Sequence, residues 1–222
     1  MSIMIGIPVI YCVECVRSCL RHLKNQNAEI FIIDNNSESE IKELIKPHKK
    51  IVNPKNVYVN PAWNQIIEEF LNSDHDVLVI MNSDLNIKHD VIQKLSDLDL
   101  DGDKTIACLN IVTEFSECER VITCVDSRVF PVPGVFIPLT EKMAREVYPI
   151  HQDIKIYFGD NWIYDKLQNI GYTCKFFSDM QATHGVSKSV NVLPEAQEVI
   201  KQDVLAWHSH IKQLLGRADN SL

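Results

Sequence analysis

The chain has 222 residues, of which 45% are hydrophobic, and its formal net charge is −8. That length suits a single domain and is enough to bury a substantial core. Proteins that bind nucleic-acid surfaces are usually basic, so the acidic balance argues against a nucleic-acid binder. An acidic protein that binds an anionic nucleotide is expected to recruit a divalent cation.

The sequence predicts neither a membrane span nor export. No run reaches about 18 apolar residues, and the start, MSIMIGIPVIYCVEC, lacks the basic region of a signal peptide. The seven cysteines are an odd number, which favours free thiols in a reducing compartment over a disulfide framework. We therefore expect a soluble cytoplasmic protein.

Strand and helix patterns alternate along the first half of the chain. Apolar runs predict strands over 3–10, 29–33, 51–53 and 76–81, and helical spacing predicts helices over 12–24, 39–46, 62–72 and 89–98. This alternation predicts an α/β fold with a mostly parallel central sheet and helices on both faces. Ligands bind beyond the carboxyl ends of such strands, so one rim is expected to hold the Pro8–Tyr11 region, Asp34–Ser37 and Asn82–Asp84.

The second half predicts a smaller, partly antiparallel portion. Strands are expected over 105–112, 120–125 and 172–177, helices over 140–147 and 160–170, and loops over 130–138 and 179–192. Pro194 opens a final helix whose expected buried face is Ala196, Val199, Ile200, Val204, Trp207, Ile211 and Leu214. We expect one domain over 1–192, made of two halves (1–100 and 101–192), and a C-terminal helix (193–222) packed on it.

Two carboxylates follow buried strands and are candidates for ligand binding. Asp84 emerges from the apolar strand DVLVIM, where a carboxylate can hold a hard divalent cation. Asp34 follows the second strand, where it can accept hydrogen bonds from a base or ribose. Both also fit simpler structural roles, a turn residue for Asp84 and a helix cap for Asp34.

Four further candidates lie in the second half. Asp160, in FGDNWIYDKLQNIGY, can take a proton from an acceptor hydroxyl, or can cap its helix. His184, in QATHGVSKS, can complete a metal site, although a lone histidine is more often structural. Ser187 and Lys188 can meet phosphate oxygens, or lie solvated in a loop.

The cysteines near the N-terminus do not predict a metal site. Cys12, Cys15 and Cys19 with His22 span about 15 Å of helical rise, whereas tetrahedral zinc needs every sulfur about 2.3 Å from the metal. Burial against the sheet is the expected role of these side chains. The sequence also has no glycine-rich phosphate loop, dinucleotide fingerprint or GxSxG elbow.

The order of these segments resembles family-2-like glycosyltransferases of the GT-A fold, in particular the rhamnosyltransferase-like members. The resemblance covers roughly residues 3–190 and rests on seven segments in the right order. These are IPVI, FIIDNNS, NPKNVYVNPAWNQII, VIMNSDLNI (similar to an "LNPD" form of the DxD metal motif), PGVFIPLTEKM, FGDNWIYDKLQNIGY and QATHGVSKS.

The resemblance implies a nucleotide-sugar donor, with a UDP-sugar favoured, bound by the half over 1–100. It implies a glycan or glycoprotein acceptor bound by the half over 101–192, where the loops 130–138 and 179–192 shape the acceptor site. It implies Mn²⁺ or Mg²⁺ held by Asp84 and His184, Asp160 as catalytic base, and inversion at the anomeric carbon. The expected donor-binding set is Pro8, Ile10, Asp34, Asn36, Asn64, Asn82, Ser83 and Lys188.

Some positions depart from the family pattern. Asn82 stands where many members have the first acid of DxD, which weakens the expected hold on a metal. Gly159 and Trp162 replace the usual acids around Asp160. Three alternatives stay open: a sugar nucleotidyltransferase, a non-catalytic sugar- or nucleotide-binding module, and a thiol redox protein that uses Cys12 and Cys15.

Overall fold

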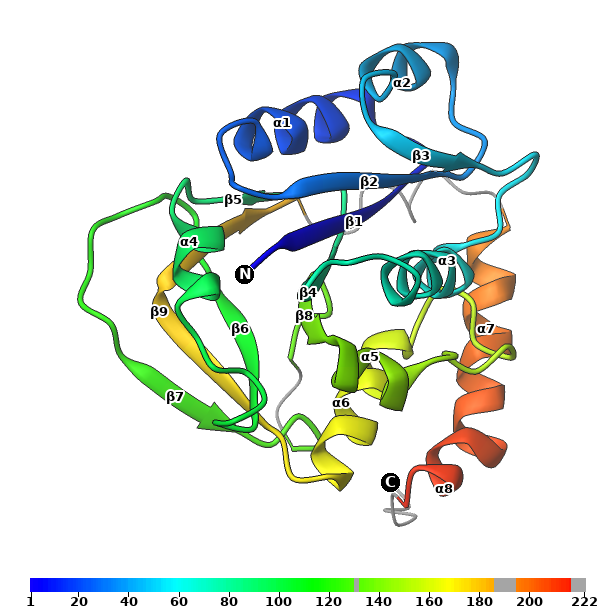
Figure 1. The fold of residues 1–222 in the computed structure, drawn as a ribbon. Coiled ribbons are helices and arrows are strands. Elements are labelled where there is room, and N and C mark those ends of the chain that lie inside the picture. Colours follow the sequence, from blue (N-terminus) through cyan, green and yellow to red (C-terminus); the bar gives the residue numbers. More distant parts are fainter. Residues whose placement is uncertain (130–131, 186–194, 217–222) are drawn as a thin grey trace.

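Two sheets and the helices around them form the computed structural model, which describes residues 1–129, 132–185 and 195–216 (Figure 1). The larger sheet has the strand order β3-β2-β1-β4-β8. Its strands are β1 (Ile3–Val9), β2 (Glu29–Asp34), β3 (Lys49–Val52), β4 (Val77–Met81) and β8 (Phe136–Thr140). All neighbours are parallel except β4 and β8. The predicted mostly parallel central sheet is therefore confirmed.

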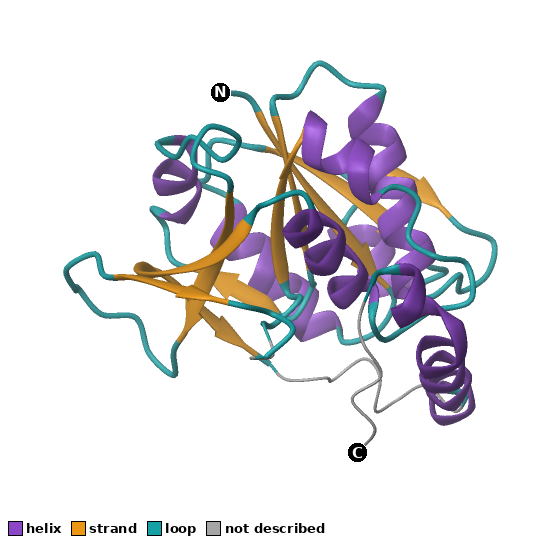
Figure 2. Ribbon diagram, turned by 90° about the horizontal axis from the view of Figure 1, so that it is seen from below, coloured by secondary structure: helices purple, strands orange, loops and turns teal. Residues whose placement is uncertain are grey.

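A smaller sheet lies beside the central one (Figure 2). It consists of β5 (Leu85–Ile87), β6 (Thr105–Ile111), β7 (Ile122–Val125) and β9 (Thr173–His184). The long strand β9 pairs with all three others, parallel to β6 and antiparallel to β5 and β7. This sheet is the partly antiparallel portion that the sequence predicts.

Helices cover both faces of the central sheet (Figure 1). On one side lie α1 (Val13–Leu23) and α2 (Ser39–Leu44), and on the other α3 (Val59–Leu71) and α5 (Glu141–Val147). The remaining helices are α4 (Val91–Ser96), α6 (Gly159–Asn169) and, at the C-terminus, α7 (Ala196–Ala206), the π-helical turn η2 (Trp207–Ile211) and α8 (Lys212–Leu214). No helix in the described part of the chain is long and apolar enough to cross a membrane.

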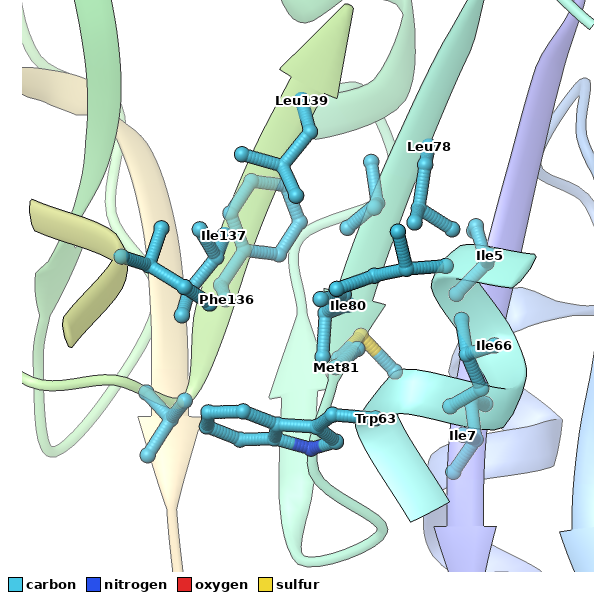
Figure 3. Close-up of a cluster of buried hydrophobic side chains, with 14 of the residues drawn as sticks. Ile5, Ile7, Trp63, Ile66, Leu78, Ile80, Met81, Phe136, Ile137 and Leu139 are labelled. Atoms are coloured by element: carbon cyan, nitrogen blue, oxygen red, sulfur yellow. The ribbon is translucent and has the colours of Figure 1, made fainter. Parts of the chain in front are cut away.

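The main core forms between the central sheet and α3. Figure 3 shows Trp63 and Ile66 of α3 beside Ile7 and Met81 of the sheet, and all four are buried. Helix and strand come very close here, because a Cβ on Gly6 would lie 2.2 Å from Ile66 Cγ2. The apolar runs of β1 and β4 are thus explained by burial on both faces of the sheet.

The loop predictions for 130–138 and 179–192 are wrong in part. Phe136–Thr140 forms β8, and β9 continues through the polar residues up to His184. Polar residues fit in this buried strand because they have partners: Asp179 lies 3.0 Å from Arg120 Nε and 3.4 Å from Lys94 Nζ. Paired polar side chains are compatible with burial, whereas unpaired ones are not.

The predicted face of the last helix is also partly wrong. Val204 and Leu214 are exposed, whereas the charged Asp203 is fully buried. Asp203 is buried because its carboxylate accepts three backbone hydrogen bonds, and the π-helical turn at Trp207–Ile211 shifts the spacing of the residues beyond it. Pro194, the predicted start of this helix, lies outside the described residues.

The cysteines differ from the expected set of free thiols. Cys12 and Cys15 form a disulfide, and their Cα atoms lie 5.3 Å apart, within bridging range. Cys19 is buried as predicted, and burial together with the charge of Asp84 raises the pKa of its thiol well above the ordinary value. A neutral, buried thiol fits the packing role that the sequence indicates.

Candidate active site

A cleft of about 410 Å³ opens at the carboxyl ends of the parallel strands. Its walls come from the ends of β1, β2 and β4, the start of α3, the residues before β8, the start of α6 and the end of β9. The lining residues are Pro8, Val9, Ile10, Asn35, Asn56, Tyr58, Val59, Trp63, Asn82, Ser83, Asp84, Gly134, Val135, Ile156, Tyr157, Phe158, Gly159, Asp160, Asn161 and His184. The sequence places ligand-binding residues at this edge, and the cleft lies there.

Asp84 and His184 meet in this cleft although they lie 100 positions apart in the sequence. Asp84 Oδ1 is 3.3 Å from His184 Nε2. Strand pairing holds the two residues in place: Leu85 lies opposite His184, and the Gly185 N–H donates to the Asp84 carbonyl at 2.9 Å. The side chains of Asp84 and His184 are only 11% and 17% exposed, so the carboxylate and the imidazole face one another with little access for solvent.

Asp160 lies in the first turn of α6 and lines the same cleft. Its Oδ1 accepts the backbone N–H of Asn161 at 2.9 Å. Burial raises the pKa of the Asp160 carboxyl; backbone hydrogen bonds oppose the shift, and the nearby Asp165 adds to it. A carboxylate with a raised pKa is a stronger base than an exposed aspartate.

Gly134 allows the chain to pass directly over Asp160. A Cβ on Gly134 would lie 2.2 Å from Asp160 Cβ and 2.5 Å from its Oδ2. Any larger residue at position 134 would push the carboxylate out of its present position. The glycine in the PGVF segment therefore helps to define the wall of the cleft.

Two non-glycine residues in left-handed backbone conformations also line the cleft. Tyr58 has φ 70° and Phe158 has φ 63°. Such conformations are costly for bulky residues and persist only where the surrounding structure holds them. Phe158 is held by stacking on Trp207 of η2, with ring centroids 4.8 Å apart and planes 8° from parallel.

The cleft also carries buried hydrogen-bond donors that have no protein acceptor among the described residues. These are Trp63 Nε1 and Asn56 Nδ2. A buried donor without a partner costs free energy, roughly 1–3 kcal/mol. Acceptor atoms of a bound ligand would satisfy both groups, so this wall of the cleft fits an oxygen-rich molecule.

Seven predicted site residues line the cleft: Pro8, Ile10, Asn82, Ser83, Asp84, Asp160 and His184. The structure brings them together from four segments that are widely separated in the sequence. Their roles in binding and catalysis stay predictions, since position alone assigns no chemistry. Lys188, the predicted phosphate contact, and its neighbour Ser187 lie outside the described residues.

Three predicted donor-binding residues are not among the residues that line the cleft. Asp34 is buried and accepts the Ser37 N–H at 2.7 Å, which is the local capping role. Asn36 is exposed, with φ 65°. Asn64 exchanges two hydrogen bonds, at 2.7 and 3.0 Å, with the backbone of Ile150. Asp34 and Asn64 thus have hydrogen-bond partners within the protein, and their contacts with a donor stay predictions.

Several lining residues escaped prediction. Asn35 lies beside the predicted Asp34, and its Nδ2 donates to the Tyr58 carbonyl at 3.3 Å. Tyr58 and Trp63 lie in NPKNVYVNPAWNQII, one of the seven segments that carry the family resemblance. A signal was present: Trp63 is an aromatic residue with a polar nitrogen at a helical position near the rim, a type that needs a partner when buried.

Solved structures of glycosyltransferases share this architecture. Staphylococcus aureus TarS 1–349 superposes with a TM-score of 0.66 at 9% identity, covering 96% of this chain and 73% of that one. A mannosyltransferase from Pyrobaculum calidifontis, in complex with GDP-Man and Mn²⁺, gives 0.65 at 10% identity, with 98% and 65% covered. GalNAc-T7 with UDP, GalNAc and Mn²⁺ gives 0.61 at 12% identity, with 93% and 49% covered.

These similarities define the fold as GT-A, the fold that the resemblance implied. The sequence model of glycosyl transferase family 2 matches residues 4–188, and the chain belongs to that family. No curated protein sequence matches it. The chain spans about half of GalNAc-T7 and about two thirds of the mannosyltransferase.

Proposed function

We propose that the protein is a metal-dependent, inverting glycosyltransferase that moves a sugar from a nucleotide-diphosphate sugar to a hydroxyl of a glycan or glycoprotein. The observation that carries the proposal is the cleft that combines the Asp84–His184 pair with the carboxylate of Asp160. A UDP-sugar is the favoured donor. Among the similar structures, TarS binds UDP and UDP-GlcNAc, whereas the mannosyltransferase binds GDP-Man.

The donor set at Asp84 and His184 fits Mn²⁺ or Mg²⁺. One carboxylate oxygen and one imidazole nitrogen, 3.3 Å apart, leave most of the coordination sphere open for diphosphate oxygens and water. When bound, such a cation offsets negative charge on the departing nucleotide. Asn82 contributes an amide where many relatives have an acid, so the protein itself supplies little negative charge to the metal.

The residues of the chain then have separate tasks. Asp84 and His184 would hold the cation, and Trp63 and Asn56 would donate hydrogen bonds to ligand oxygens. Asp160 takes the proton of the acceptor hydroxyl as that oxygen attacks the anomeric carbon. The apolar side chains of Ile156 and Phe158 line the same cleft and help exclude water.

Binding of nucleotide and metal tests the donor site. We would measure thermal unfolding with UDP, GDP, dTDP and CMP, each with and without Mn²⁺, for the wild type, Asp84→Asn and the exposed-acid control Asp74→Asn. A ligand at a hundred times its Kd adds about 2.7 kcal/mol, which for this size raises Tm by roughly 5–10 °C. We expect one nucleotide to do so only with Mn²⁺, in the wild type and in Asp74→Asn but not in Asp84→Asn.

The alternative is a non-catalytic binding module, and the amide at Asn82, in place of an acid, favours that alternative. Turnover of the matching sugar nucleotide distinguishes an enzyme from such a module. Slow hydrolysis or transfer that Asp160→Asn abolishes supports the enzyme. Tight, metal-dependent binding without any turnover on a panel of acceptors supports the binding module. No stabilisation by any nucleotide contradicts both.

A further inference from the structure

A second group of possible metal ligands lies outside the cleft. His151 and Asp153 come from the segment between α5 and α6, and His210 comes from the π-helical turn η2. One ligand atom from each residue lies within 4.8 Å of the other two. None of the three residues lines the cleft that holds Asp84 and His184, so this cluster is a separate feature.

The spacing of the cluster matches the ligand spacing around a small transition-metal ion. Asp153 Oδ2 lies 3.1 Å from His210 Nε2 and 3.8 Å from His151 Nδ1. Ligands at about 2.0–2.1 Å from a tetrahedral zinc are about 3.3 Å from one another. An ion at the centre of this triangle would need only small side-chain adjustments.

The surroundings of both histidines favour ligation. The Nδ1 of His210 lies 2.8 Å from the Ser209 hydroxyl, so the ring can donate there while Nε2 keeps its lone pair toward Asp153. Metal-bound histidines usually fix their second nitrogen in this way. The His151 ring packs on Trp162, with centroids 5.7 Å apart. Its Nδ1 accepts the backbone N–H of Asp153 at 3.3 Å, a long contact that a metal would replace.

The chemistry of the cluster selects a metal different from that of the donor site. Two imidazoles and one carboxylate suit Zn²⁺, whereas Mn²⁺ and Mg²⁺ prefer mainly oxygen ligands. The side chains of Asp153 and His210 are each 45% exposed, and that of His151 is 23% exposed. A water molecule can therefore complete a four-coordinate site, and the ion can enter from solvent.

The position of the cluster suggests what it would do. It joins η2 to the segment that leads into α6, and α7 and η2 meet this segment at two other points. The carboxylate of Asp203 accepts the backbone N–H groups of Lys155, Ile156 and Tyr157 at 2.7–2.8 Å, and Phe158 stacks on Trp207. Ile156, Tyr157 and Phe158 line the cleft, so this junction supports one of its walls.

We propose that His151, Asp153 and His210 form a zinc site that fastens the C-terminal helix to the segment before α6. The ion would act as a cross-link between two distant parts of the chain, rather than as a participant in sugar transfer. Without zinc, the three residues are connected by the partly exposed polar contacts of Asp153, which contribute little to stability, and by an edge contact between the rings of His151 and His210, whose centroids are 5.6 Å apart.

Zinc binding to the full, untagged chain tests this proposal. The measurements use protein stripped with EDTA, carrying Cys118→Ser and Cys124→Ser because these exposed thiols are competing zinc ligands. We would titrate ZnCl₂ by calorimetry, measure Tm with and without ZnCl₂, and record the visible absorption of the CoCl₂ complex. The variants are His210→Gln, the control His208→Gln on the same helical turn, and Asp84→Asn.

The expected result is one zinc per chain, a zinc-dependent rise in Tm, and a cobalt spectrum of four- or five-coordinate type. His210→Gln should weaken zinc at least tenfold and remove the rise in Tm, whereas His208→Gln and Asp84→Asn should keep both. Gln at position 210 can still hydrogen-bond to Asp153, so loss of zinc without loss of the fold is the diagnostic outcome. Absence of zinc binding, or equal binding by wild type and His210→Gln, would overturn the proposal. All three readouts are independent of nucleotide, so they remain informative if the proposed transferase activity fails.

Discussion

The proposed reaction and the fold favour opposite protonation states of the Asp160 carboxyl. Burial raises the pKa of its carboxyl, so the ionised form that a general base needs is the form that the fold tolerates less. A group whose pKa is raised on folding contributes stability at low pH and loses that contribution as pH rises through the folded-state pKa. At neutral pH the ionised Asp160 therefore lowers the free energy of unfolding.

The variant Asp160→Asn should separate function from stability. We expect transfer to fall by about 10²–10⁴-fold, the usual contribution of a general base, while the Mn²⁺-dependent nucleotide shift in Tm is retained. Near pH 8 the Tm of the variant should exceed that of the wild type, and the difference should shrink as pH falls toward the ordinary range of aspartate. Wild-type activity should decline on the acid side, through the raised pKa. Retention of transfer by the variant would remove Asp160 from the proposed mechanism.

Individual site residues were predictable where the strand pattern alone determines their position. Asp84 follows a fully apolar strand, and that strand must end at the ligand edge. Asp34 also follows a strand, yet its side chain folds back onto the Ser37 N–H. A strand-end position predicts the edge of the sheet but not the direction of the side chain, which depends on the backbone of the next three residues. The roles of Asp84, His184 and Asp160 remain predictions.

The contact between α7 and the segment before α6 is expected to contribute both to stability and to nucleotide binding. Replacing Asp203 with Ala removes the acceptor of three backbone N–H groups, one of them buried and two partly buried. Lost hydrogen bonds to a charged group cost about 2–3 kcal/mol, so Tm should fall by roughly 4–12 °C. Because the freed segment carries Ile156, Tyr157 and Phe158, we also expect weaker nucleotide binding.

The matched control is Glu198→Ala, an exposed acid on the same helix. It should leave both Tm and nucleotide binding near their wild-type values. If Asp203→Ala lowers Tm but leaves the Kd of the nucleotide unchanged, α7 stabilises the protein without shaping the cleft.

Elements were predictable from periodicity when one face is apolar, and much less so when polar side chains are buried in pairs. The helices around the central sheet were placed within a few residues of their observed bounds. The second half of β9 was predicted as a loop because SDMQATH is polar. Its Asp179 is paired with Arg120 and Lys94, partners that lie about 60 and 85 positions away. Pairing over such distances leaves no local pattern in the sequence.

At the scale of the whole molecule, alternating strands and helices were sufficient to predict the central sheet. Parallel strands joined by helices have few topological solutions, and the observed order β3-β2-β1-β4 is one of them. The smaller sheet could not be predicted in the same way. Its strand β9 pairs with β5, β6 and β7, which are spread over 41 residues, and neither the partners nor the register follow from the segments themselves.

The pairing of β5 with β9 has a consequence for insertions and deletions. Since side chains alternate across a strand, deleting one residue between Gln181 and His184 turns the imidazole to the opposite face of the sheet. We therefore expect deletion of Thr183 to abolish Mn²⁺-dependent stabilisation by nucleotide. A Gly-Ser insertion between the exposed Thr113 and Glu114 should leave it intact, as thermal unfolding of the two variants would show. A length change elsewhere between β5 and β9 that spares this pairing should therefore leave Asp84 and His184 facing one another.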